Sequence, residues 1–194
     1  VDGLTKISGG IFGDRASAQA ENFKKLLLTM SDDIRVILIK IADRLHNMRT
    51  LQYQSERKQK EKALETMEIY APIAHRLGMQ RIKWELEDLS LQYLDPIGYH
   101  EIEQELATGS AEHEQFLSNT QKHIQQRLAQ DGIPCTVYGR VKHIYSVYRK
   151  MYAQNKTLKE IFDLYAFRVI VDDIPTCYNV LGCIHDMYKP VLGR

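Results

Sequence analysis

The chain has 194 residues, of which 44% are hydrophobic, so it is long enough to bury one large core or two small ones. Its 26 lysine and arginine residues nearly balance 25 aspartate and glutamate residues. This balance excludes the strong overall positive field of proteins that bind long nucleic acids or anionic membranes, so any phosphate binding must be local. No apolar run in the sequence is long enough to cross a membrane.

Three cysteines, Cys135, Cys177 and Cys183, form no Cys-x-x-Cys pair. Their odd number argues against the disulfide framework of a small secreted protein. We therefore expect the protein to work in the reducing cytoplasm.

The first two thirds of the chain show the spacing of apolar residues that is typical of helices. The predicted helices span, in order, residues 14–30, 31–51, 55–78, 81–94, 96–106 and 110–130. Ser31 or Asp32 can cap the second helix, and Pro72 should kink or interrupt the third, because proline has no backbone N–H. Val36–Ile39, taken alone, fits a short buried strand, but the length of the periodic stretch favours a helix.

After Gly132 the pattern changes to alternating strands and helices, which predicts a mixed α/β unit. The predicted elements are a strand at 135–138, a helix at 143–153, a strand at 164–171 and a helix at 175–188. We place a helical domain at 1–108, a connecting helix at 109–132 and the α/β domain at 133–194. Two strands cannot bury both faces of a sheet, and the first residue is Val1 rather than methionine. We therefore expect an internal segment of a longer protein, with the α/β domain truncated.

A row of polar side chains on the second predicted helix is the first candidate site. If Leu45 and Met48 face the core, Asp43, Asn47 and Thr50 share one neighbouring face, because spacings of four and three return to the same side of a helix. A carboxylate, an amide and a hydroxyl in that row can hold a metal ion and a nucleoside together. The same pattern also fits a solvated polar face on which Asp43 pairs with a nearby arginine.

A group of cations around the predicted start of the helix at 143–153 is the second candidate site. Arg140 and Lys142 precede this helix, while Ser146 and Lys150 lie one turn apart on it. Cations at a helix N-terminus suit a polyphosphate, and Asp163, at the entry of the next strand, can hold the metal ion that phosphoryl transfer needs. A solvated basic helix face and a carboxylate that only shapes a turn explain the same residues.

Several stretches resemble the long RelA/SpoT homologues, the bifunctional enzymes that make and degrade guanosine tetra- and pentaphosphate, (p)ppGpp. The matching stretches are residues 1–6, 33–51, 74–78, 82–89, 139–151, 161–164 and 188–190. The most characteristic are ADRLHNMRT at 42–50 and GRVKHIYSVYRKM at 139–151. They occur in the family's order over nearly the whole chain.

The resemblance implies an all-helical hydrolase domain of the HD type, followed by a synthetase domain similar to nucleotidyltransferases. In the family's hydrolase, a Mn²⁺ ion activates water against the 3′-pyrophosphate of (p)ppGpp. Asp43 matches the family's last metal ligand. Asn47 and Thr50 match positions that contact the guanine nucleotide.

The family's synthetase moves the β,γ-pyrophosphate of ATP onto the 3′-hydroxyl of GTP or GDP. By resemblance, the residues that bind ATP are Arg140, Lys142, Ser146 and Lys150. Asp163 matches a catalytic carboxylate that binds Mg²⁺. The resemblance also implies contacts with the ribosome and tRNA, through regions absent from this chain.

Some of the family's functional residues would lie before Val1 or after Arg194, so we expect this chain alone to catalyse neither reaction. The intact stretch from Asp43 to Thr50 favours a bifunctional parent protein. Two alternatives stay open. One is a hydrolase-dominant relative with an inactive synthetase, which the intact set from Arg140 to Asp163 opposes. The other is a non-catalytic scaffold that senses nucleotides or docks on the ribosome.

Overall fold

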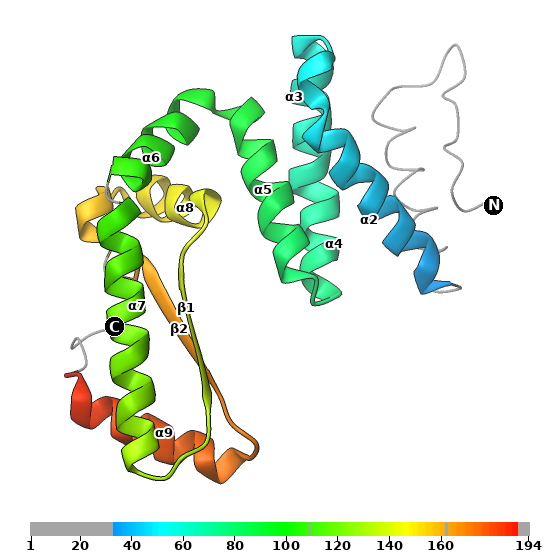
Figure 1. Ribbon diagram of the computed structural model, residues 1–194. Coiled ribbons are helices and arrows are strands. Elements are labelled where there is room, and N and C mark those ends of the chain that lie inside the picture. Colours follow the sequence, from blue (N-terminus) through cyan, green and yellow to red (C-terminus); the bar gives the residue numbers. More distant parts are fainter. Residues whose placement is uncertain (1–32, 109, 162, 190–194) are drawn as a thin grey trace. The chain divides into compact units, whose positions relative to one another are not determined.

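The computed structural model describes residues 33–108, 110–161 and 163–189, and the chain divides into two compact units between Pro96 and Ile97 (Figure 1). The helix predicted at 14–30 and the predicted caps Ser31 and Asp32 lie outside the described residues. Each unit is therefore described separately, over these ranges.

The first unit is helical throughout the part that the structure describes. Its elements are α2 (Ile34–Arg49), the 3₁₀ turn η2 (Leu51–Tyr53), α3 (Glu56–Glu65), the π-helical turn η3 (Thr66–Tyr70), α4 (Ala71–Arg76) and α5 (Gln80–Leu94). Asp33 caps α2, because its side chain accepts a hydrogen bond from the backbone N–H of Arg35 at 2.9 Å. The stretch Val36–Ile39 is part of α2, as its periodicity predicted.

The core of the first unit lies where one face of α2 meets α4 and α5. The buried side chains of α2 recur at helical spacing and include Ile37, Ile41, Leu45 and Met48. They pack in one cluster with Ala74 of α4 and Leu86 of α5, both fully buried. This packing leaves the polar faces of α2 and α3 available to line a pocket.

The helical hydrogen bonding changes immediately before Pro72. The N–H of Ala71 bonds to the carbonyl of Thr66, five residues earlier, so a single π turn replaces the α-helix. The prediction that Pro72 interrupts its helix is confirmed. The segment ends at Gly78, whose φ of 72° lies in the left-handed region that glycine adopts without steric cost.

The second unit mixes helices with two strands. Its elements are α6 (Pro96–Thr108), α7 (Ser110–Gln130), β1 (Thr136–Val141), α8 (Ile144–Gln154), the 3₁₀ turn η4 (Leu158–Glu160), β2 (Tyr165–Ile170) and α9 (Ile174–Met187). A helical unit followed by a mixed α/β unit was predicted from the sequence and is confirmed. Within the described ranges, no helix has the length and apolar character needed to span a membrane.

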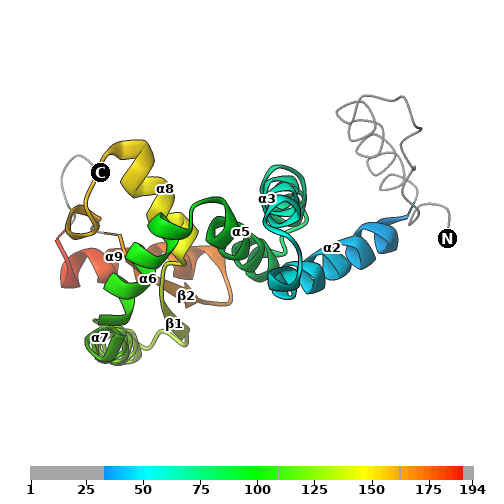
Figure 2. The ribbon, with the colours of Figure 1, turned by 90° about the horizontal axis from the view of Figure 1, so that it is seen from above.

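Strands β1 and β2 pair in antiparallel register and expose one face while the other packs on helices (Figure 2). On the packed side, Val137 and Val169 join Ile124 and Leu128 of α7 in one cluster with α9. Gly139 also lies on this side, where a Cβ atom would sit 2.8 Å from the ring of Phe167. The close approach of strand and ring therefore requires glycine.

Helix α6 belongs to the second unit. The domain boundary that we placed at residue 108 would instead assign it to the first. Ile102 of α6 is fully buried in a cluster with Val147 of α8, Ile161 and Leu164. Helices α6 and α7 instead belong to the same unit. The compact units thus divide at Pro96, because a buried contact, and not a change in polarity, decides which core a helix joins.

Two candidate sites, one in each unit

A pocket of about 450 Å³ lies between α2 and α3 in the first unit. Asp43 and Asn47 of α2 line it, together with Thr50, the residue that caps the C-terminus of the helix. The predicted helical spacing thus places all three side chains on one face. The pocket brings the first predicted set of residues together.

Local hydrogen bonds orient these side chains. Asn47 Nδ2 donates to Asp43 Oδ2 at 3.1 Å, and the hydroxyl of Thr50 donates to the carbonyl of His46 at 3.1 Å. Asp43 therefore accepts from an amide, and among the described residues it forms no ion pair with an arginine. The amide of Asn47 thus orients the carboxylate of Asp43 at the pocket.

The floor of the pocket is a buried ion pair. The side chain of Arg44 is 5% exposed and pairs with Glu65 at 2.9 Å, and its guanidinium lies 4.2 Å from the ring centroid of Tyr70. Because Glu65 neutralises it, Arg44 acts as a structural cation that ties α2 to the end of α3. The π turn before Pro72 carries Tyr70 into this position.

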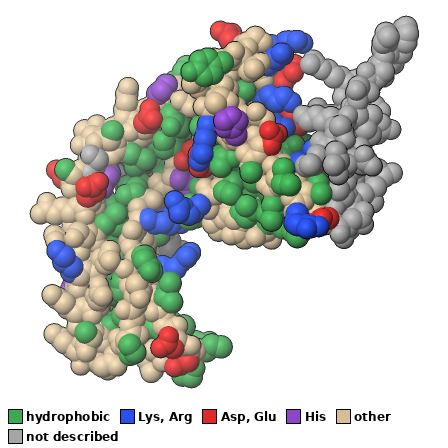
Figure 3. Space-filling model, turned by 45° about the vertical axis from the view of Figure 1, so that its right-hand side comes forward, with side chains coloured by type: hydrophobic (Ala, Val, Ile, Leu, Met, Phe, Trp, Pro, Cys, Tyr) green, Lys and Arg blue, Asp and Glu red, His purple; other side chains and the backbone are tan. Residues whose placement is uncertain are grey.

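The opposite wall comes from α3, which contributes Lys58, Glu61 and Lys62. Lys62 pairs with Glu65 at 2.9 Å, whereas Lys58 forms no ion pair with the residues that the structure describes. Cationic and acidic side chains are interspersed over this unit (Figure 3). Sequence reasoning missed this wall, because α3 is charged on nearly every side and no periodicity distinguishes the face that lines a pocket.

In the second unit, two predicted cations converge on the predicted carboxylate. Lys142 Nζ lies 2.5 Å from Oδ2 of Asp163, and Lys150 Nζ contacts the same oxygen. Lys142 follows β1, Lys150 is on α8 and Asp163 precedes β2. The backbone holds this arrangement, because the N–H of Lys142 donates to the carbonyl of Leu164 at 2.9 Å.

These contacts fix the charge of the carboxyl group. The hydrogen bond from Lys142, followed by that from Lys150, lowers the pKa of Asp163 to about 2. The side chain is nevertheless 50% exposed, so it stays accessible to a ligand. Asp163 is therefore an ionised, reachable carboxylate between two cations and does more than shape a turn.

Ser146 and Arg140 lie around this trio. Ser146 is in the first turn of α8, with its hydroxyl 3.1 Å from Nε2 of His143. Arg140 is on β1 opposite Ala166, on the exposed face of the sheet. The structure brings Lys142, Lys150 and Asp163 into direct contact and places the other two predicted residues on the adjoining helix start and strand.

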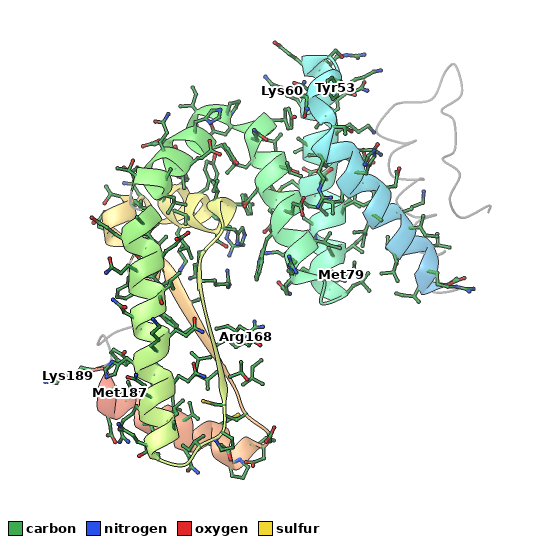
Figure 4. The ribbon with its side chains drawn as sticks, in the orientation of Figure 1. Tyr53, Lys60, Met79, Arg168, Met187 and Lys189 are labelled. Atoms are coloured by element: carbon green, nitrogen blue, oxygen red, sulfur yellow. The ribbon has the colours of Figure 1, made fainter. Side chains whose placement is uncertain are left out.

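Arg168 is a further candidate that sequence reasoning missed. It pairs with Tyr138 across the two strands and so shares the exposed face with Arg140, as a diagonal neighbour. Figure 4 shows Arg168 projecting from β2 on the side away from α7. An arginine in a strand looks like an ordinary solvent-facing residue in the sequence, and only the register of the strands places it beside Arg140.

The chemistry of the donors suits hard divalent cations at both sites. Carboxylate oxygens such as those of Asp43 and Asp163 are preferred by Mn²⁺ and Mg²⁺. Among the described residues, however, no three His, Cys, Asp or Glu side chains gather into a metal-binding group. Each aspartate fits the role of one ligand in a set and not that of a complete site.

Comparison with known families covers both units. Residues 4–80 match the profile of the HD domain, and residues 139–194 match that of the region found in RelA/SpoT proteins. The first match includes the polar row of α2, and the second includes the residues that surround Asp163. Both candidate sites therefore fall inside matched segments.

Similar full-length proteins extend this match to the whole chain. The bifunctional (p)ppGpp synthase/hydrolase SpoT of Escherichia coli K12 is 47% identical over 194 residues, which are 100% of this chain and 28% of that protein. GTP pyrophosphokinases of Myxococcus xanthus and Streptomyces coelicolor are 47% and 48% identical, again over 100% of this chain but over 26% and 23% of their own lengths. The chain thus spans 23% to 28% of the length of these relatives. It belongs to the RelA/SpoT family.

Proposed function

We propose that the whole protein makes and degrades (p)ppGpp, with a hydrolase site in the first unit and a synthetase site in the second. The observation that carries this proposal is the convergence of Lys142 and Lys150 on Asp163, a separate site from the pocket lined by Asp43. Two different sites in one chain suit two opposed reactions. Relatives named for each activity, and one named for both, support the same reading.

In the synthetase, Lys142 and Lys150 release Asp163 and bind the triphosphate of ATP instead. The first turn of α8, at Ser146, binds the same triphosphate. Arg140 and Arg168 then face the rest of the donor from the exposed sheet. The 3′-oxygen of GTP or GDP attacks the β-phosphorus, the bond from that phosphorus to the α,β-bridging oxygen breaks, and AMP leaves.

Once the lysines have moved to ATP, Asp163 would hold Mg²⁺, which when bound supplies charge neutralisation on the transferred phosphates. Before ATP binds, the two lysines keep the pKa of Asp163 low, so its carboxylate is already deprotonated when a ligand arrives. The carboxylate needs no further activation, and its exposed side chain can reach a ligand that enters from solvent.

In the hydrolase, Asp43 would be one of several ligands for Mn²⁺, which when bound would activate the attacking water. Asn47 holds the carboxylate by its amide, and Thr50 presents a hydroxyl at the rim of the same pocket. These two residues contact the guanine nucleotide. Attack on the 3′-pyrophosphate releases pyrophosphate and leaves GDP or GTP.

Two isosteric variants of the whole protein test whether the two reactions take place at two separate sites. With labelled ATP and GDP, Asp163→Asn should abolish pyrophosphate transfer and leave (p)ppGpp hydrolysis intact, whereas Asp43→Asn should do the reverse. Each variant is thus the control for the other. Loss of both activities in both variants, or of neither, would contradict two separate sites.

The same transfer and hydrolysis assays distinguish the proposed function from the competing functions. A hydrolase-dominant relative with an inactive synthetase would show hydrolysis but no transfer by the unaltered protein. A non-catalytic scaffold would show neither reaction. The paired cations around Asp163 favour an active synthetase, because a site that has lost its function has no need to keep two lysines on one carboxylate.

Location and macromolecular partners form part of the same proposal. The three cysteines are free thiols in the structure, which supports a reducing cytoplasmic location. We assign any contacts with the ribosome and tRNA to parts of the whole protein outside this chain.

A further inference from the structure

We propose that Gln59 is a positioning residue of the first-unit pocket, and that its side-chain amide holds the turn between α2 and α3 in the shape that nucleotide binding needs. The inference rests on the proposed hydrolase function. It adds a residue that neither the family resemblance nor the helical pattern indicates.

Three hydrogen bonds carry the proposal. Nε2 of Gln59 lies 3.0 Å from the carbonyl oxygen of Gln54, 3.3 Å from that of Leu51 and 3.4 Å from that of Gln52. The backbone N–H of Gln59 is meanwhile bonded within α3 to Ser55 at 2.9 Å. The side chain of one α3 residue therefore spans the turn that precedes its own helix.

The turn needs such a donor. The carbonyl groups at the end of a helix have no partner within it, and a 3₁₀ turn has poorer hydrogen-bond geometry than an α-helix. In η2, the N–H of Tyr53 reaches Thr50 at 3.4 Å and the N–H of Gln54 reaches Leu51 at 3.0 Å. The two N–H bonds of the Gln59 amide together supply donors to the carbonyls of Gln52 and Gln54 and a second donor to that of Leu51.

The turn forms the rim of the pocket. Thr50, Leu51 and Gln54 all line it, and Gln59 donates to the carbonyls of two of these three residues. Tyr53, by contrast, is 81% exposed at the outer end of the turn (Figure 4). Gln59 thus anchors the turn from α3 through the carbonyls of Leu51 and Gln54, two residues that line the pocket.

This arrangement predicts an effect on binding and not on chemistry. Asp43 lies in the middle of α2, whose position is fixed by its buried face, so loss of the Gln59 contacts should leave the proposed metal ligand in place. Thr50 and Gln54 would then adopt several conformations, and nucleotide binding would have to select one of them. KM for (p)ppGpp should rise while kcat changes little.

The decisive variants in the whole protein are Gln59→Glu, which has the same shape but no N–H donor, and Gln59→Lys, which restores a donor. We expect Gln59→Glu to raise KM for (p)ppGpp hydrolysis about fivefold, in line with the loss of a typical hydrogen bond. Gln59→Lys should recover most of the affinity. Lys60→Ala, the exposed neighbour on α3 (Figure 4), is the matched control and should behave like the unaltered protein.

Hydrogen exchange supplies a second readout that does not depend on catalysis. In Gln59→Glu, the amide protons of Tyr53 and Gln54 should exchange faster than in the unaltered protein, while those in the middle of α2 should not. A KM equal to that of the unaltered protein, a fall in kcat alone, or unchanged exchange in the turn would overturn the positioning role. If the unaltered protein fails to hydrolyse (p)ppGpp, the proposed function fails, and the exchange experiment still decides the role of Gln59.

Discussion

The ammonium group of Lys142 lies 2.5 Å from the carboxylate of Asp163, so the cation proposed to bind phosphate holds the acid proposed to bind metal. Lys142 follows β1 and Asp163 precedes β2, so the two groups meet just beyond the paired part of the two strands. Such a pair keeps the Asp163 carboxylate ionised and holds both side chains in place until a ligand arrives, which limits the reorganisation that binding requires.

The first prediction concerns the stability of the protein at acidic pH. The pKa of Asp163 falls from 3.8 to about 2 on folding, so its contribution to stability is present above about pH 4 and is lost as the pH falls towards 2. Because the side chain is half exposed, solvent screening keeps the effect small. Urea unfolding at a series of pH values should show a smaller acid-induced loss in Asp163→Asn, and 1 M salt should reduce the difference. Identical pH profiles in low salt would contradict the pairing.

The second prediction concerns the exposed face of the sheet. Arg168→Ala should raise KM for ATP in pyrophosphate transfer by roughly 2- to 30-fold, the range expected for a guanidinium that contacts an aromatic base. Hydrolysis of (p)ppGpp should not change. Arg149→Ala, which removes an exposed cation from α8, is the control for a general loss of positive charge. If both variants weaken ATP binding equally, the diagonal placement beside Arg140 has no special role.

The third prediction concerns the floor of the first pocket. Arg44→Leu removes one partner of a buried ion pair, while Lys62 still pairs with Glu65. We expect a loss of about 3 kcal/mol in the free energy of unfolding, measured by urea denaturation. The double variant with Glu65→Leu should recover part of this loss, because no buried carboxylate that has lost its arginine then remains. An equal or larger loss in the double variant would argue that the packing of the arginine over Tyr70 dominates.

The fourth prediction uses two glycines with opposite expected outcomes. Gly139→Ala would place a Cβ atom 2.8 Å from the ring of Phe167 and should destabilise the second unit by about 1–3 kcal/mol. Gly182→Ala in α9 meets open space and should stabilise the helix by roughly 0.5–1 kcal/mol. Thermal unfolding of the two variants should therefore shift in opposite directions. Shifts of the same sign would contradict the packing of β1 on Phe167.

Local patterns were enough to predict some of this structure. The spacing of Asp43, Asn47 and Thr50 is fixed by the geometry of a single helix, so their shared face followed from the sequence. The extents of most helices followed in the same way from capping residues, proline and glycine. The roles of these three residues in binding metal and nucleotide stay predictions.

Features that depend on contacts between distant segments could not be predicted. Arg168 gains its place beside Arg140 from strand register, and Gln59 gains its role from a turn that lies before its own helix. The placement of α6 in the second unit depends on the burial of Ile102 against α8. In each case the residue type fits several environments, and a partner elsewhere in the chain selects one.

The antiparallel register of β1 and β2 links folding of the second unit to assembly of its site. Side chains alternate between the faces of a strand, so a slip of either strand by one residue would turn its arginine towards Ile124 and Leu128 and expose a valine instead. The apolar contacts that select the correct pairing thus also put Arg140 and Arg168 side by side. A misaligned hairpin would lose both its core and the pair of arginines that we propose to face the nucleotide, so a stably folded but wrongly assembled second unit is an unfavourable state.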